Sequence, residues 1–176
     1  LWGPQGAREG TFAAVELYET AGFGQNRDGR RATVMAQYEG KSGAHLYRIT
    51  AQAYVASFHS AGVLREDDYR SGRVGFFDTY DTKQGADTGR YSLSGLLESR
   101  AGSFLVRNQV YAIARPMRLR ENFTGFLLDT QEPTQSLHGQ RGDLIDLQSM
   151  AGTLGARGFA RLSGDILNQT QEIEVG

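Results

Sequence analysis

The sequence predicts an all-β fold, an antiparallel transmembrane β-barrel wall of about seven to eight long strands. Three observations lead to this prediction. Apolar and polar residues alternate with period two over several long runs, helical periodicity is nowhere sustained, and short and long connections between the runs alternate strictly. Together they favour a sheet with one apolar and one polar face, with tight turns at one end and large loops at the other.

The alternation defines the expected strands. In the run 90–98, Tyr91, Leu93 and Leu97 share one face. Arg90 and Glu98 take the opposite face, because successive side chains of a strand point to opposite sides. The run 46–58 is 13 residues long, whereas strands of soluble proteins usually have about five to six residues and a tilted strand crosses a bilayer with about 9–11. The expected strands cover residues 11–19, 31–39, 46–58, 90–98, 106–115, 150–162 and 170–175.

The connections between these runs differ in length. Short turns are expected at residues 39–43, 100–103 and 163–165, and long links at 21–30, 59–89 and 116–147. Two links of about thirty residues are unusual in a compact soluble domain. They are typical of a barrel whose one rim carries tight turns and whose other rim carries external loops.

Aromatic residues lie where a membrane interface would place them. Tyr38, Tyr47 and Phe104 lie on the apolar face within a few residues of the short turns. Tyr91 lies on the same face towards the other end. Their positions suggest aromatic girdles at the two membrane interfaces.

Composition excludes several classes of function. The chain has 176 residues, a net charge of −1 and no cysteine. Without a basic run, nucleic-acid binding is not expected, and without cysteine neither disulfides nor zinc–thiolate sites can form. No apolar window is long enough for a membrane-spanning helix. We expect residues 1–176 to be a single segment of an outer-membrane barrel, with no plug domain visible.

The polar face is expected to point into a lumen, where its charges pair with one another or with a plug. Seven strands are an odd number, whereas bacterial single-chain barrels have even counts, so the segment is expected to belong to a larger barrel. Two alternatives stay open. With an eighth strand at 74–78 the chain would be a complete small barrel with a structural or adhesive role, and with a covering sheet it would be a soluble β-sandwich binding module. The expected lumen charges include Arg48, Glu98, Arg107, Arg157 and Arg161.

Several segments resemble a known family. The stretch 72–81 followed by 90–95, and the stretch 119–127 followed by 140–143, resemble early barrel strands and loops of TonB-dependent outer-membrane receptors. The resemblance implies a plugged barrel of about 22 strands in the bacterial outer membrane. It also implies uptake of a small ligand such as a metal chelate, with energy relayed by TonB. The chain departs from the family in showing neither a plug domain nor a TonB-contacting segment.

Loop residues supply the candidate ligand site. Arg65, Arg118 and Arg120 offer guanidinium groups for an anionic chelate, and Tyr69 and Phe123 offer aromatic surface. Packing of the loop against the barrel is the alternative role for the aromatic residues.

No enzyme, metal site or cofactor is expected. His45, His59 and His138 lie far apart in sequence and in no metal-binding motif, and no nucleophile motif is present. The acidic residues of the long loop, including Asp67 and Asp68, are interpreted as solvated charges and not as a calcium site, because their spacing differs from that of a calcium-binding loop.

Overall fold

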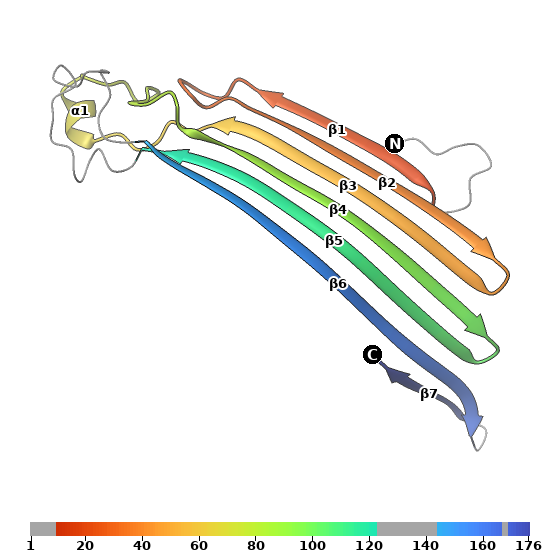
Figure 1. The fold of residues 1–176 in the computed structure, drawn as a ribbon. Helices are drawn as coiled ribbons and strands as arrows, with labels where there is room; N and C mark the ends of the chain where they lie inside the picture. Colours follow the sequence, from red (N-terminus) through yellow and green to blue (C-terminus); the bar gives the residue numbers. More distant parts are fainter. Residues whose placement is uncertain (1–9, 123–143, 167–168) are drawn as a thin grey trace.

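The computed structural model describes residues 10–122, 144–166 and 169–176, which form one antiparallel sheet of seven strands (Figure 1). Each strand pairs with its neighbours in sequence, from β1 to β7, and the sheet does not close on itself. The predicted all-β class and antiparallel wall are therefore confirmed. The strands are β1 Phe12–Thr20, β2 Gly29–Ser42, β3 His45–His59, β4 Gly85–Ala101, β5 Phe104–Glu121, β6 Ile145–Ile166 and β7 Gln169–Val175.

The strands are long, with 17, 18 and 22 residues in β4, β5 and β6. Several extend further than the apolar alternation indicates: β4 begins at Gly85 and not near Arg90, and β5 continues to Glu121. The physical reason is that outward positions near the loops are charged. Asp87 and Arg120 form an ion pair across β4 and β5 at 3.0 Å, so the ladder continues where the apolar pattern stops.

One face of the sheet is apolar and uncovered. Cross-strand partners share a face, and one such row contains Ala51, Leu93, Ala112 and Leu154. Leu93 and Leu154 are 55% and 86% exposed. Ala86 is the one buried hydrophobic residue among those that the structure describes. The described residues therefore form a single layer whose apolar side chains have no protein core to enter.

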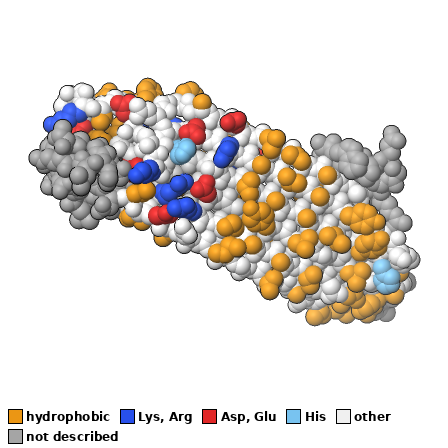
Figure 2. All heavy atoms as spheres, turned by 45° about the horizontal axis from the view of Figure 1, so that its top comes forward, with side chains coloured by type: hydrophobic (Ala, Val, Ile, Leu, Met, Phe, Trp, Pro, Cys, Tyr) orange, Lys and Arg blue, Asp and Glu red, His pale blue; other side chains and the backbone are white. Residues whose placement is uncertain are grey.

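The apolar face changes character along the strands. Figure 2 shows hydrophobic side chains spread over the half of the sheet away from the long loops, and charged side chains gathered close to the loop end. The boundary between the two regions follows the register of the strands. The last apolar row contains Leu17, Val55 and Met150. The next row on the same face, two residues closer to the loops, contains Glu19, Ser57 and Gln148. The face thus consists of an apolar belt with a charged rim.

The loops 21–28 and 60–84, the latter with short α1, lie at one end of the sheet, opposite the hairpin turns at residues 43–44 and 102–103 (Figure 1). Helix α1, Glu66–Arg70, belongs to the loop 60–84. Asn26 adopts a left-handed conformation, with φ of 54°, and its side-chain amide donates to the carbonyl oxygens of Ser60 and Gln84 at 2.5 and 3.0 Å. This contact holds the loops 21–28 and 60–84 together.

The structure contradicts one of the alternatives and one predicted turn. Residues 74–78, considered as an eighth strand, form turns and bends and no strand. Local hydrogen bonds hold the backbone in this shape. The carbonyl oxygen of Asp68 accepts from the backbone amide of Arg73 at 2.9 Å, and the carboxylate of Asp78 accepts from the backbone amide of Gly75 at 2.6 Å. Residues 163–165 are not a turn, because β6 continues to pair with β7 as far as Ile166. Among the described residues, no helix has the length and apolar character needed to cross a membrane.

Candidate functional site

The polar face carries a group of charged residues near the hairpin turns, and we call it the arginine cluster: Glu39, Arg48, Glu98, Arg107 and Arg157. One cross-strand row contains, in order, Glu39, Arg48, Leu96, Gln109 and Arg157. Glu98 and Arg107 are partners in the adjacent row of the same face. The period of two that places apolar residues outward therefore places these charges together on the other side.

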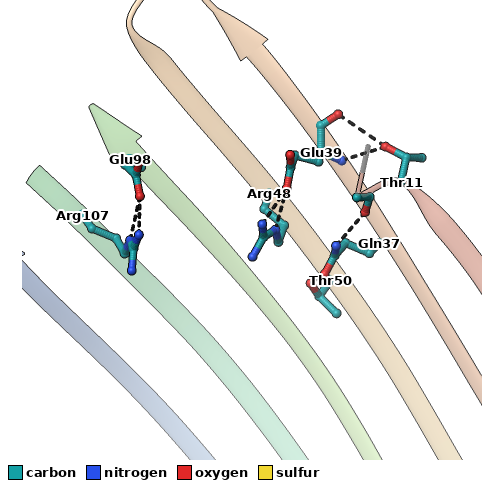
Figure 3. Close-up of polar contacts among 8 residues, drawn as sticks. Thr11, Gln37, Glu39, Arg48, Thr50, Glu98 and Arg107 are labelled. Atoms are coloured by element: carbon teal, nitrogen blue, oxygen red, sulfur yellow. Dashed lines mark hydrogen bonds and ion pairs between the residues drawn. The ribbon is translucent and has the colours of Figure 1, made fainter. Parts of the chain in front are cut away.

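The first ion pair of the cluster joins β2 and β3. Arg48 Nε and Nη2 donate to Oε2 of Glu39 at 3.0 and 2.6 Å (Figure 3). The backbone amide of Glu39 donates to Oγ1 of Thr11 at 3.0 Å. The Glu39 side chain is 11% exposed, so its charge is compensated by the adjacent guanidinium and not by water alone.

The second ion pair joins β4 and β5. Arg107 donates from Nε at 2.9 Å, and also from Nη2, to Oε2 of Glu98 (Figure 3). Arg100 donates to the other carboxylate oxygen of Glu98 at 3.1 Å. The guanidinium carbon of Arg107 also lies 5.1 Å from the ring centre of Phe159, within the range of a cation–π contact. Two arginines thus share one carboxylate.

Arg157 differs from the other arginines of the cluster. Its Nε donates to Oε1 of Gln109 at 2.8 Å, and no ion pair joins it to a carboxylate of the described residues. Arg161, on the same strand, pairs instead with Glu174 at 3.3 Å. The predicted pairing of the polar-face charges is therefore confirmed for Arg48, Arg107 and Arg161. For Arg157 the described residues supply an amide partner and no carboxylate, and pairing with a plug stays a prediction.

A hollow of about 310 Å³ opens between these side chains. Its walls carry three guanidinium groups, two amides and two hydroxyl groups, and Leu96 contributes apolar surface. An adjoining hollow of about 300 Å³ shares Leu96, Arg107, Gln109 and Arg157 with it. Donors outnumber acceptors here, so the arrangement suits an anionic or hydrogen-bond-accepting group.

The predicted ligand-binding residues do not gather in one site. Arg65 precedes α1 and lies 3.9 Å from Asp67, measured from Nη2 to Oδ2. Tyr69, in α1, is 51% exposed and contacts Phe76 edge-on, with ring centres 6.1 Å apart. These two residues belong to the loop 60–84, and Phe123 lies outside the described residues.

Arg118 and Arg120 lie elsewhere, on the charged rim of the apolar face. Arg118 pairs with Asp146 at 2.6 Å, and Arg120 pairs with Asp87. Both are even-numbered residues of β5, as are Val110 and Ala112, and alternation therefore turns them to the same side as the apolar belt. They face away from the arginine cluster, a placement that residue parity alone would have indicated.

A buried group of polar residues at the loop end was not predicted from the sequence. Asp81, Gln84 and Asn122 are 2–4% exposed. Asn122 donates its side-chain amide to Oδ2 of Asp81 and its backbone amide to Oε1 of Gln84, both at 3.0 Å. The group joins the loop 60–84 to the end of β5. Isolated polar residues in a loop carry no periodic signal, so sequence gave no indication of it.

An exposed pair lies beside this group. His59 Nδ1 is 2.9 Å from Oδ1 of Asp28. The hydrogen bond from His59 holds the pKa of the Asp28 carboxyl below its ordinary value of 3.8. This pair links the end of β3 to the residue that precedes β2.

No protein-family model, curated protein or solved structure matches this chain. Within the described ranges, no three or more histidine and carboxylate side chains lie close enough together to hold a metal ion.

Proposed function

We propose that this chain forms part of the wall of a larger outer-membrane β-barrel, of the kind found in TonB-dependent receptors, that admits a small ligand such as a metal chelate. The observation that carries the proposal is the uncovered apolar belt. Val110, Leu93 and Leu154 are all more than half exposed on one face, and exposing so much contiguous apolar surface to water is strongly unfavourable. Lipid chains would cover it without that cost.

The height of the belt supports a bilayer as the covering medium. On β5 the belt runs from Phe104 to Pro116, twelve steps (116 − 104), or ~40 Å along the strand at about 3.3 Å a step. A tilt of about 45° reduces this to ~28 Å, close to the apolar band of about 25 Å on known barrels. Asn108 is the one polar side chain among the outward residues of this stretch.

The open edges of the sheet support a larger ring. An exposed sheet edge leaves backbone N–H and C=O groups without partners, and hydrocarbon cannot supply them. In an antiparallel sheet of seven strands, β1 and β7 run in the same direction. Antiparallel closure therefore needs at least one further strand between them, and no residue of the described loops supplies it. We propose that the remaining strands and a plug domain complete the receptor.

The arginine cluster fits the interior of such a ring. In this arrangement the polar face lines an aqueous lumen, where charged side chains stay hydrated or contact a plug. The loop 60–84, including α1 with Arg65 and Tyr69, would lie at the opening of the barrel on the outer surface of the bacterial outer membrane. A ligand would pass from these loops along the polar face, with energy supplied through TonB.

Two observations test the proposal. The purified chain should need detergent to stay soluble, and the folded form should migrate differently on an unheated gel than after boiling. A chain that remains monomeric without detergent would contradict the membrane assignment. The sequence of the gene on both sides should then encode a plug domain and further alternating strands, whereas a closed ring of eight strands in this chain alone would contradict the receptor assignment.

A further inference from the structure

We infer that the hollow between Arg48, Arg107 and Arg157 is a binding site for the oxyanion group, carboxylate or phosphate, of a small ligand. The inference rests on the proposed function, since it assumes that the polar face lines a path for small molecules, and it deepens that function by naming the charge class of the ligand. It concerns residues on the turn side of the sheet, not the loop residues considered above.

The charge balance of the hollow leaves positive charge uncompensated. Three guanidinium groups line it, while the carboxylates that contact them belong to Glu39 and Glu98. Glu98 is moreover shared with Arg100. A ligand carboxylate or phosphate would balance this charge.

Arg157 supplies the donors for that contact. Its Nε donates to Gln109, and neither of its terminal nitrogens forms a hydrogen bond or ion pair with another residue of the described ranges. A guanidinium carries five N–H donors in a planar fork that matches a carboxylate or phosphate. The bond to Gln109 fixes the direction of the fork, so part of the conformational cost of binding is already met.

The neighbouring groups complete the recognition surface. The lining of the hollow includes the Gln37 amide and the hydroxyl groups of Thr50 and Ser94. Thr50 donates to Oε1 of Gln37 at 3.1 Å, and the amide NH₂ group of Gln37 donates to the carbonyl oxygen of Gly10 at 2.6 Å. These two bonds hold the Gln37 side chain in a fixed position in the wall of the hollow. The volume of about 310 Å³ is at the small end of ligand pockets, which run from about 300 to 1,000 Å³. It suits one anionic group with its immediate substituent.

Side-chain NMR of the complete barrel that contains this chain, folded in detergent micelles, tests the site with citrate and, separately, inorganic phosphate as probes. The Nε–H signal of Arg157, assigned by its loss in Arg157→Gln, should shift saturably with a dissociation constant on the order of 1 mM. The signal of Arg107 should shift in parallel. Citrate binding stronger than phosphate binding would indicate a carboxylate ligand, and the reverse order a phosphate ligand.

Variants make the test specific. Arg157→Gln should weaken binding of the probe about tenfold, as reported by the Arg107 signal, because it removes a charge-assisted contact. The matched variant Arg161→Gln, on the same strand and face, should bind as the parent does, and circular dichroism confirms that both are folded. Absence of saturable shifts in the parent, or equal binding by Arg157→Gln, would overturn the inference. The membrane proposal is judged separately, by the need for detergent.

Discussion

At the residue scale, two glycines make room for aromatic rings on the neighbouring strand. A Cβ atom at Gly40 would lie 2.2 Å from Cζ of Tyr47, and one at Gly155 would lie 2.2 Å from Cζ of Tyr111. Each pair is directly opposite in the register. The ring covers the backbone that the glycine leaves bare, which is a known way to stabilise glycine in a sheet.

Gly155→Ala should lower the free energy of unfolding by about 1–3 kcal/mol, because the added methyl group forces the Tyr111 ring from its place. Gly152→Ala is the matched control on the same strand, since nothing lies within 4 Å of its added Cβ, and its effect should stay within about 0.5 kcal/mol. Urea unfolding of both variants in detergent measures the difference. Equal losses in the two variants would contradict the close contact with Tyr111.

The pair Asp28–His59 predicts a dependence on pH. The folded-state pKa of Asp28 is lowered from 3.8 by the hydrogen bond from His59, so the stabilisation is present above that ordinary value and is lost as pH falls through the lowered pKa. Below pH 3.8, the parent should therefore lose more stability than Asp28→Asn. Acid unfolding curves of the two proteins check this, and parallel curves would show that the pair does not contribute.

At the element scale, β4 and β5 show what alternation predicts and what it misses. The period of two correctly assigns Leu93 and Val110 to one face and Glu98 and Arg107 to the other. The alternation does not predict the ends of the strands. There charged pairs replace apolar pairs, so the composition of the strand no longer differs from that of a loop. The alternation also does not indicate that Pro116 lies inside a central strand, β5. Gly89 on β4 faces Pro116 closely, because a Cβ atom at Gly89 would lie 3.1 Å from Cγ of Pro116.

The pairing of Glu98 with Arg107 should stabilise the β4–β5 hairpin. A double-mutant cycle with Glu98→Gln and Arg107→Gln should give a coupling energy of about 1 kcal/mol, limited by the solvent that reaches the arginine. The exposed pair Glu16–Arg31, with side chains 55% and 45% exposed, is the control and should give about 0–0.5 kcal/mol. Similar coupling in the two cycles would mean that burial of Glu98 has no energetic consequence.

At the scale of the whole molecule, the described residues form a sheet with two faces and no interior between layers. Its fold class and the composition of its faces follow from the sequence, because both depend on a local period. The arrangement of the loops does not, because contacts such as Asn122 with Asp81 join residues 41 positions apart. The choice of Arg118 and Arg120 as candidate ligand residues rests on their charge, whereas strand parity determines the face of the sheet on which they lie.

Single-cysteine spin labelling in liposomes tests the central claim, that the apolar belt faces hydrocarbon, most directly. The chain has no cysteine of its own, so a label can be placed at Leu93, Val110 or Leu154 and, for comparison, at Ser94, Gln109 or Thr153. The first three labels should be accessible to oxygen and protected from a water-soluble nickel chelate, and the other three should show the reverse. Labels at Leu93, Val110 and Leu154 that are immobile and inaccessible to both reagents would place the belt against protein and contradict the account.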